Sequence, residues 1–256
     1  MKNQYCAIKS RFDKKLSPGV IFAVLLTMSG LVQPAQAADP KDAGISLGST
    51  RVIYNEKSGA AAIRIINTSS IPFLVQTWVD NYQGAGGWEK TSVLAPGTFV
   101  ATPPLFRLDK GENSVRIQRA SGNLPADRES VFQLKVKTIP SASKPTPGTS
   151  YVQFAFVNAV KLFWRPVGLT GKPDDAYKSL TFKRQGDKIE AVNPTPYHIT
   201  LKKLSVGGVA IKDPDSRMVP PLSSQTWPLP AGAGGKVTFE AINDYGALTP
   251  PLTVSF

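Results

Sequence analysis

The sequence predicts an all-β protein made of two immunoglobulin-like β-sandwich domains arranged at an angle. From Ile45 onward, short runs of alternating apolar and polar residues are separated by turn residues. No stretch keeps a helical hydrophobic period over a useful length. Seven of the runs fall within residues 45–165, which is typical of an immunoglobulin-like sandwich.

The expected strands of the first domain are separated by residues that break β-structure. The polar glycine turns EKSG and DKGEN and the Pro/Ser/Gly segment Ser141–Ser150 divide neighbouring runs. Pro103 and Pro104 cannot donate to a central ladder, so their run predicts a strand that changes sheets or lies at an edge. The expected strands lie within residues 45–55, 60–69, 72–81, 98–108, 114–120, 131–140 and 151–163.

A second, smaller β-sandwich is expected after a junction at Arg165–Lys172. Its runs again alternate and are again broken by glycine, proline and asparagine. The two halves share a fold class but no period that would make them sequence repeats. The expected strands lie within residues 179–185, 188–196, 198–208, 224–230, 236–244 and 252–256.

The N-terminus has the pattern of a secretory signal peptide. Basic residues precede the apolar run VIFAVLLTMSGLV, and AQA at Ala35–Ala37 follows it, which predicts cleavage after Ala37. The apolar run is shorter than the ~20 residues of a spanning helix, so we expect an exported protein that is not membrane-embedded. Cys6 is the only cysteine and lies in this leader, so the mature chain has no disulfide available. The resulting division is 1–37 signal peptide, 38–165 N-terminal domain and 166–256 C-terminal domain.

The composition argues against an enzyme, a metal site, a cofactor or a nucleic-acid partner. The net charge is +12, but the basic residues are scattered and never form a run of five. His198 is the only histidine, so a nucleophilic triad would need it, and zinc sites of His and Cys are excluded by the count. Asp174 and Asp175 are expected in a solvated turn, and the segments 84–87 and 231–235 are expected to be hairpin tips.

Residues 151–163 stand out as a long strand with one apolar face. As a single strand they would span roughly 40 Å at about 3.3 Å per residue. Val152, Phe154 and Phe156 lie at alternate positions, next to a Pro/Ser/Gly segment that is expected to form a flexible loop. Alternation alone equally fits an ordinary core strand, because every sandwich strand buries one face.

Several segments in order and spacing resemble the periplasmic pilus chaperones of the chaperone-usher pathway. The resemblance covers nearly the whole mature chain and rests on ATPPLFRL (101–108), LPADRESVFQLKVKTIP (124–140), KLFWRP (161–166), NPTPYHIT (193–200) and INDYGA (242–247). Gln133 stands where the family usually has an aromatic residue, and Lys135 where it has asparagine. The cysteine pair that some relatives have near the C-terminus is also lacking.

The resemblance implies a function for the apolar strand. It would be lent to a pilus subunit whose own fold lacks its final strand, with Val152, Phe154 and Phe156 as the inserted side chains. Arg51 and Lys161 match the basic pair that anchors the subunit's terminal carboxylate in a cleft between the domains, where both are expected to face solvent. Simple alternation puts Lys161 on the face opposite Phe156, so this role requires a bulge, a strong twist or anchoring from the strand's edge.

The resemblance also implies an interdomain ion-pair network and a set of partners. The network would consist of Glu129, Arg165 and Asp244, which otherwise would be three independent surface charges. The expected partners are pilus subunits in a 1:1 complex and an outer-membrane usher, in the periplasm. When no subunit is bound, the chain is expected to cap its own exposed strand edge by forming an oligomer. The loop before the lent strand is expected to be of the short type.

A second class of function remains open at this point. A secreted two-domain β-sandwich could bind carbohydrate or envelope components directly, as an adhesin does. It would be expected to place binding aromatics on loops, and Trp88 and Trp227 are the candidates. Both residues are equally compatible with packing.

Overall fold

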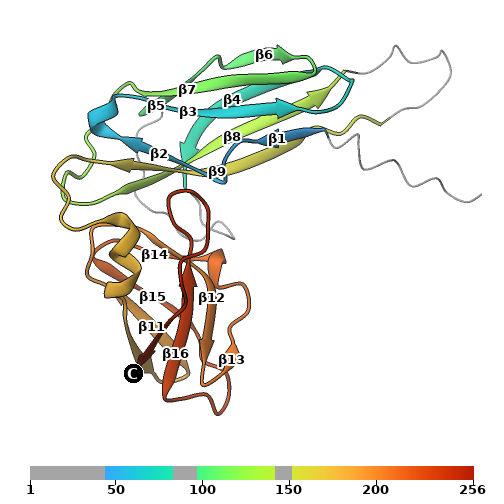
Figure 1. Cartoon of the computed structure of the whole chain (residues 1–256). Helices are drawn as coiled ribbons and strands as arrows, with labels where there is room; N and C mark the ends of the chain where they lie inside the picture. Colours follow the sequence, from blue (N-terminus) through green and yellow to red (C-terminus); the bar gives the residue numbers. More distant parts are fainter. Residues whose placement is uncertain (1–43, 83–96, 142–151) are drawn as a thin grey trace, which may run out of the picture. The chain divides into compact units, whose positions relative to one another are not determined.

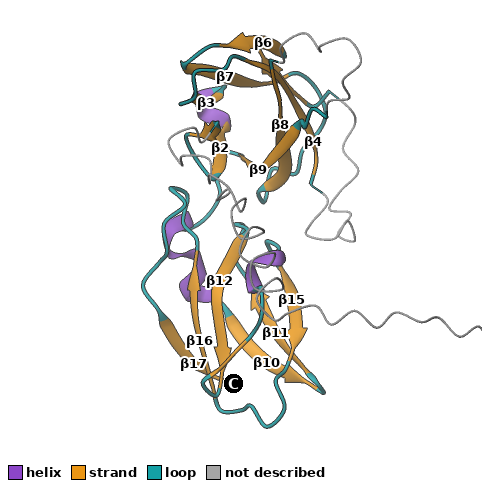
Figure 2. Ribbon diagram, turned by 90° about the vertical axis from the view of Figure 1, so that its right-hand side faces the viewer, coloured by secondary structure: helices purple, strands orange, loops and turns teal. Residues whose placement is uncertain are grey.

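The computed structural model describes residues 44–82, 97–141 and 152–256. The predicted signal peptide, its cleavage site and the segment 84–87 lie outside the described residues, as does Trp88. Strands dominate the described part, and helix is limited to short 3-10 turns (Figure 2). The prediction of an all-β fold with two sandwiches is confirmed.

The first sandwich consists of two sheets (Figure 1). The four-stranded sheet has the order β1 (Ile45–Leu47), β3 (Ala61–Asn67), β7 (Gly111–Arg119) and β5 (Phe99–Thr102). The five-stranded sheet has the order β2 (Arg51–Asn55), β9 (Phe156–Arg165), β8 (Ser130–Pro140), β4 (Phe73–Asn81) and β6 (Leu105–Leu108). A short helix η2 (Glu56–Ser58) follows β2. Alternate residues of both sheets form one core, which includes Ile65, Val75, Val115, Leu134 and Leu162.

Two of the sequence runs change sheets. The run 45–55 divides into β1 and β2, which belong to different sheets. The run that contains Pro103 and Pro104 divides into β5 and β6, each at the edge of its sheet, as predicted. Thr77 secures this crossing, since its backbone N–H donates to the Pro104 carbonyl and its hydroxyl donates to the Pro103 carbonyl, both at 2.8 Å.

The long strand begins later than the sequence predicted. β9 starts at Phe156, opposite Thr138 of β8, and continues to Arg165, whereas residues 152–155 are not in a strand. If the ladder continued in the same register, Phe154 would pair with Pro140 of β8. Proline has no N–H to donate to such a ladder. The side-chain amide of Gln153 instead donates to the Pro140 carbonyl. The expected single strand 151–163 is therefore wrong at its start.

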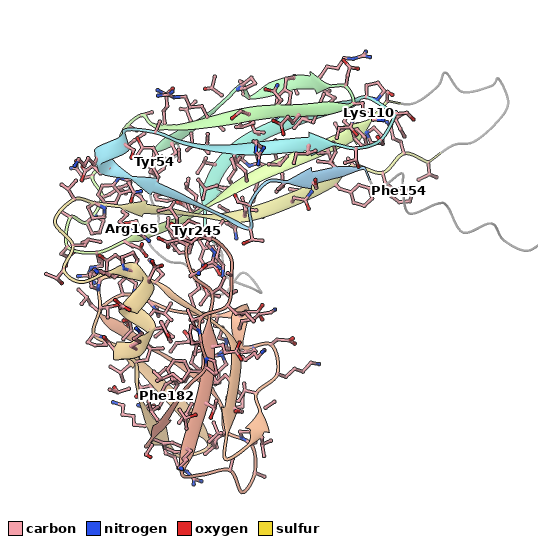
Figure 3. All side chains as sticks on the ribbon, viewed as in Figure 1. Tyr54, Lys110, Phe154, Arg165, Phe182 and Tyr245 are labelled. Atoms are coloured by element: carbon pink, nitrogen blue, oxygen red, sulfur yellow. The ribbon has the colours of Figure 1, made fainter. Side chains whose placement is uncertain are left out.

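The second sandwich has its own core. One sheet has the order β10 (Thr181–Gln185), β11 (Lys188–Asn193) and β15 (Ser223–Pro228). The other has the order β13 (Val209–Ala210), β12 (Ile199–Val206), β16 (Lys236–Ala241) and β17 (Leu252–Ser255), with β14 (Met218–Val219) also paired to β12. The short strands β13 and β14 were not predicted. Figure 3 labels Tyr54 in the first sandwich and Phe182 in the core of the second.

Two turn segments differ from expectation. Residues 231–235 are not a hairpin tip, because they connect β15 and β16, which lie in different sheets. Gly207 packs against this loop, where a Cβ atom would lie 2.9 Å from the Gly234 carbonyl oxygen. Asp174 and Asp175 are exposed, as expected, but they lie in the short helix η3 (Pro173–Ser179). A second short helix, η4, spans Pro214–Ser216.

The helical segments of the described part are short. Within the described ranges, none of them has the length and apolar character that crossing a bilayer requires.

Candidate functional site

Arg51 and Lys161 are brought side by side by the parallel pairing of β2 with β9. They are direct partners in this ladder, so their side chains lie on the same face of the five-stranded sheet. The β8–β9 register runs without a shift from Phe156 to Trp164, so Lys161 is on the face opposite Phe156. The ladder therefore has no bulge in β9. Lys161 also marks the point where β2 begins to cover the edge of β9.

Arg51 is more buried than the expectation of a solvent-facing pair required. Only 9% of its surface is exposed, and its Nη1 donates to the Ile242 carbonyl at 3.1 Å. Its guanidinium carbon lies 5.9 Å from the centre of the Phe163 ring. Burial lowers the pKa of Arg51, and the negative charges of Asp244 and Glu129 oppose that shift. Lys161 is half-buried, with Nζ 5.7 Å from the centre of the Tyr82 ring.

The apolar residues before and at the start of β9 are exposed. The exposed fractions are 76% for Val152, 67% for Phe154 and 63% for Phe156. These values exclude the reading in which the three side chains fill the sandwich core. Phe154 is labelled in Figure 3, at the end of the segment that leads into β9.

The start of β9 also has an open edge. β8 pairs with β9 from Phe156 to Trp164, but β2 pairs only with Lys161–Arg165. Among the described residues, no strand pairs with residues 156–160 on the β2 side. Backbone N–H and C=O groups on that side are therefore available to another chain.

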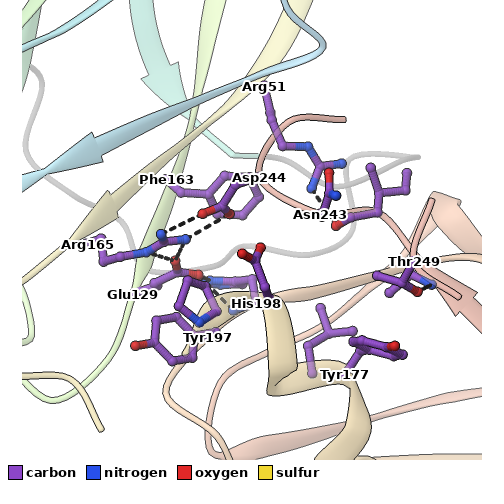
Figure 4. Close-up of a pocket in the computed structure, with 15 residues that line it drawn as sticks. Arg51, Glu129, Phe163, Arg165, Tyr177, Tyr197, His198, Asn243, Asp244 and Thr249 are labelled. Carbon is purple, nitrogen blue, oxygen red and sulfur yellow. Dashed lines mark hydrogen bonds and ion pairs between the residues drawn. The ribbon is translucent and has the colours of Figure 1, made fainter. Parts of the chain in front are cut away.

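Glu129, Arg165 and Asp244 come together in one network, although they are far apart in sequence (Figure 4). The Arg165 Nε donates to the Glu129 Oε1 at 2.7 Å, and its two terminal nitrogens donate to Asp244 at 2.7 and 3.0 Å. The side chain of Glu129 is 2% exposed and that of Arg165 is 14% exposed. Burial alone would lower the pKa of Arg165, but its hydrogen bonds with Asp244 and the charge of Glu129 raise it above its usual range.

The network has two further members that sequence reasoning missed. The backbone N–H of His198 donates to the Glu129 Oε2 at 2.8 Å, and the His198 ring nitrogen Nδ1 lies 3.4 Å from the same oxygen. The Arg165 guanidinium stacks 5.3 Å from the centre of the Tyr197 ring. From the sequence, His198 was expected to matter only as the histidine that a nucleophilic triad would need. A contribution through the backbone has no signal in the residue type.

A small cavity lies among these residues. Its volume is about 30 Å³, and its lining includes Arg51, Arg165, His198, Asn243 and Asp244 (Figure 4). Such a volume suits one or two water molecules and is far below the roughly 300 Å³ of a small-molecule site.

The two departures from the family pattern lie next to the basic pair. Gln133 of β8 is the direct partner of Lys161 and also of Asp80 on β4. The Lys135 Nζ donates to the Asp80 Oδ2 at 2.8 Å, and this hydrogen bond lowers the pKa of Asp80. Both departures therefore face the same side of the sheet as Lys161.

Comparisons with known proteins agree over both sandwiches. The family model for the PapD N-terminal domain of pili and flagellar-assembly chaperones matches residues 44–170, and the model for the C-terminal domain of the pili assembly chaperone PapD matches residues 175–252. Chaperone protein FimC of Escherichia coli strain K12 is 35% identical over 249 residues, which cover 96% of each chain. Chaperone protein FocC of Escherichia coli is 40% identical over 211 residues, covering 81% of this chain and 88% of the relative.

Solved structures give the same result. The Escherichia coli chaperone DraB superposes with a TM-score of 0.71 at 38% identity, covering 83% of this chain and 96% of that chain. A chain from the complex of the Salmonella enterica SafA pilin with the SafB chaperone superposes with a TM-score of 0.72 at 30% identity, with the same coverage. These relatives are chaperones, which are not a class of enzyme. The chain belongs to the PapD-like family of pilus assembly chaperones.

Proposed function

We propose that this chain binds and folds pilus subunits in the periplasm by lending them the open edge of β9 and the apolar side chains of Val152, Phe154 and Phe156. It thereby prevents the aggregation of the subunits and delivers them to an outer-membrane usher. The observation that carries the proposal is the row Val152, Phe154 and Phe156, which is exposed by 63–76% beside an unpaired strand edge. The naming of SafB as a chaperone in complex with the SafA pilin supports subunits as partners.

The energetics fit reversible capture. Burying each of the three side chains is worth roughly 1.5–3 kcal/mol. Each added ladder hydrogen bond contributes about 0.5–1.5 kcal/mol net. Association costs about 4–15 kcal/mol, so the side chains alone would bind weakly, whereas the side chains together with a ladder hold a subunit.

Arg51 and Lys161 are the proposed anchor of the subunit's terminal carboxylate. The open edge of β9 ends where these two cations meet, because β2 occupies the edge from Lys161 onward. A subunit strand that lies along residues 156–160 and ends at Lys161 must run parallel to β9. Two cations at one end then set the register of that strand, and a slip by one residue would present its wrong face.

The Glu129–Arg165–Asp244 network is the proposed tie between the domains 38–165 and 166–256. Arg165 is the last residue of β9, and its partner Asp244 follows β16. A buried network of this kind contributes more to a defined arrangement than to net stability, because desolvation offsets much of the attraction between the charges.

The proposed function extends to the stoichiometry, the export and the subunit-free state of the chain. We propose a 1:1 complex with the subunit, export after cleavage near Ala37, and self-capping of the β9 edge into an oligomer when no subunit is present. The alternative, direct binding of carbohydrate or envelope components, is not favoured. Trp227, one of its two candidate aromatics, is 3% exposed and belongs to the core of the second sandwich.

Co-purification from periplasm tests the proposal. The chain is co-expressed with a pilin-like subunit encoded beside it, and wild type is compared with Lys161→Ala. Lys212→Ala, an exposed lysine of the second sandwich, is the control. We expect a 1:1 complex with wild type and the control and none with Lys161→Ala. Equal complexes in all three would leave subunit binding intact and discard the anchor, whereas no complex in any would overturn the proposed function.

A further inference from the structure

Two adjacent rows of side chains cross the outer face of the five-stranded sheet. The first is a polar row of direct partners in neighbouring strands, made of Asp80, Gln133, Lys161 and Arg51. The second is an apolar row one side-chain position away, made of Tyr82, Val131, Phe163 and Ile53. Alternate residues of a strand share a face, so both rows lie on the same side of the sheet. The proposed carboxylate anchor is therefore bordered by apolar side chains.

Each cation of the anchor lies against a ring of the apolar row. The guanidinium carbon of Arg51 is 5.9 Å from the centre of the Phe163 ring. The Lys161 Nζ is 5.7 Å from the centre of the Tyr82 ring. Both distances fall within the range of about 6 Å in which the face of an aromatic ring attracts a cation. Each ring lies on the β4 side of its cation in the strand order, so both basic side chains extend in the same direction across the sheet.

The two cations differ in burial and in the stiffness of their side chains. Arg51 is 9% exposed, and its rigid guanidinium donates to the Ile242 carbonyl at 3.1 Å. Lys161 is half-buried and carries its ammonium on a flexible four-carbon stem. Ordering such a stem when a ligand binds costs conformational entropy, and a contact already made in the free protein reduces that cost. Support from a ring therefore has more effect on Lys161 than on Arg51.

Tyr82 can serve as a fixed support because it is itself buried. Only 4% of its surface is exposed, and it belongs to an apolar cluster with Val131, Phe163 and Met218. Interiors are close-packed, so a ring in such a cluster keeps a defined orientation. The ammonium of Lys161 then has a defined place beside this ring, at the point where β2 closes the open edge of β9.

We propose that Tyr82 is a positioning residue for Lys161: its ring holds the ammonium ready for the terminal carboxylate of a strand that binds at the open edge of β9. The inference rests on the proposed function, because it requires a carboxylate between Arg51 and Lys161. An ammonium group has three N–H donors, so it can face the ring and still donate to the carboxylate. Tyr82 acts on the subunit only through the lysine.

Fluorescence anisotropy with two synthetic peptides tests the inference. Both peptides reproduce the C-terminal segment of the pilin-like subunit used for co-purification, and they end either in a free carboxylate or in an amide. The ratio of their dissociation constants isolates the contribution of the carboxylate from that of the strand edge. We expect the mature wild-type chain to bind the free-carboxylate peptide about tenfold more tightly, the order of a hydrogen bond to a charged group. Tyr82→Leu keeps an apolar side chain but removes the ring, and should lower this preference about two- to fivefold, whereas Tyr82→Phe should retain it.

A double-mutant cycle assigns the effect to the lysine. In Lys161→Ala the carboxylate preference should already be reduced, and adding Tyr82→Leu should reduce it no further. A second measurement needs no change at Tyr82. In the NMR spectrum of the wild-type chain, the ring should shift the Lys161 methylene protons next to Nζ upfield, and Lys161→Ala identifies these signals by removing them.

The outcomes separate the inference from the proposed function. A loss of affinity in Tyr82→Leu that is equal for both peptides would mean that the ring only supports the strand edge, and would overturn the inference. The same conclusion would follow from a Tyr82→Phe variant that behaves like Tyr82→Leu, from additive effects in the cycle, or from Lys161 signals without an upfield shift. Absence of a carboxylate preference in wild type would overturn the anchor and the inference while leaving strand capture intact. Failure of both peptides to bind would overturn strand capture itself.

Discussion

Replacement of Glu129 by glutamine should destabilise the protein far more than loss of a surface ion pair. The side chain of Glu129 is 2% exposed and accepts hydrogen bonds from Arg165 at 2.7 Å and from the His198 backbone at 2.8 Å. Glutamine has one oxygen, so its amide group must face either the Arg165 guanidinium or the His198 N–H, and both are donors.

The magnitude follows from these contacts. Removing one partner of a buried ion pair costs about 3–5 kcal/mol. Arg165 keeps its bidentate contact with Asp244, so we expect the lower end, about 3 kcal/mol. At about 2–4 °C per kcal/mol for a chain of this size, Tm should fall by about 6–12 °C.

Thermal unfolding followed by circular dichroism measures this effect, with Lys178→Gln as the control. Lys178 pairs with Asp175 at 2.7 Å, but both side chains are more than half exposed, so the control should change the free energy of unfolding by less than about 0.5 kcal/mol. A Glu129→Gln variant that melts within a degree or two of the control would refute the reasoning. It would mean that the network is solvated in solution.

Three further outcomes are expected. Phe154→Ser should change the free energy of unfolding of the free protein by less than about 0.5 kcal/mol from the wild-type value, because the side chain is 67% exposed. The same variant should weaken subunit binding by about 1.5–3 kcal/mol in titration calorimetry. A large drop in its Tm would contradict the exposure of the side chain. Arg51→Ala should abolish subunit binding and also lower stability by about 1–3 kcal/mol in urea titrations, because it leaves the Ile242 carbonyl without its donor; unchanged stability would argue against this burial. The Lys135 hydrogen bond lowers the pKa of Asp80, so the stability that the pair adds is present above the ordinary carboxyl pKa of about 3.9 and is lost as pH falls through the lowered value. The difference between wild type and Asp80→Asn should be below about 1 kcal/mol at pH 7, since the Asp80 side chain is 43% exposed, and should vanish in acid; a constant difference across that range would exclude the ion pair as its source.

Several features of the fold and of the candidate site could be predicted from the sequence because they depend on local patterns. The alternation in residues 156–164 correctly put Phe156 and Lys161 on opposite faces. Pro103 and Pro104 correctly indicated a change of sheets. The start of β9 could not be predicted, because it depends on the end of the neighbouring strand at Pro140.

The sequence by itself determined the all-β class, the two sandwiches and the opposite faces of Phe156 and Lys161, because strand periodicity and turn residues act over a few neighbouring positions. Only the tertiary structure decided that Arg51 lies beside Lys161, since parallel strands far apart in sequence must first pair. It also decided that the Glu129 carboxylate meets a backbone N–H of residue 198, a group that every non-proline residue carries and no sequence pattern marks. Burial, pairing and charge balance at this site arise from contacts between distant segments, and residue types alone do not specify those contacts.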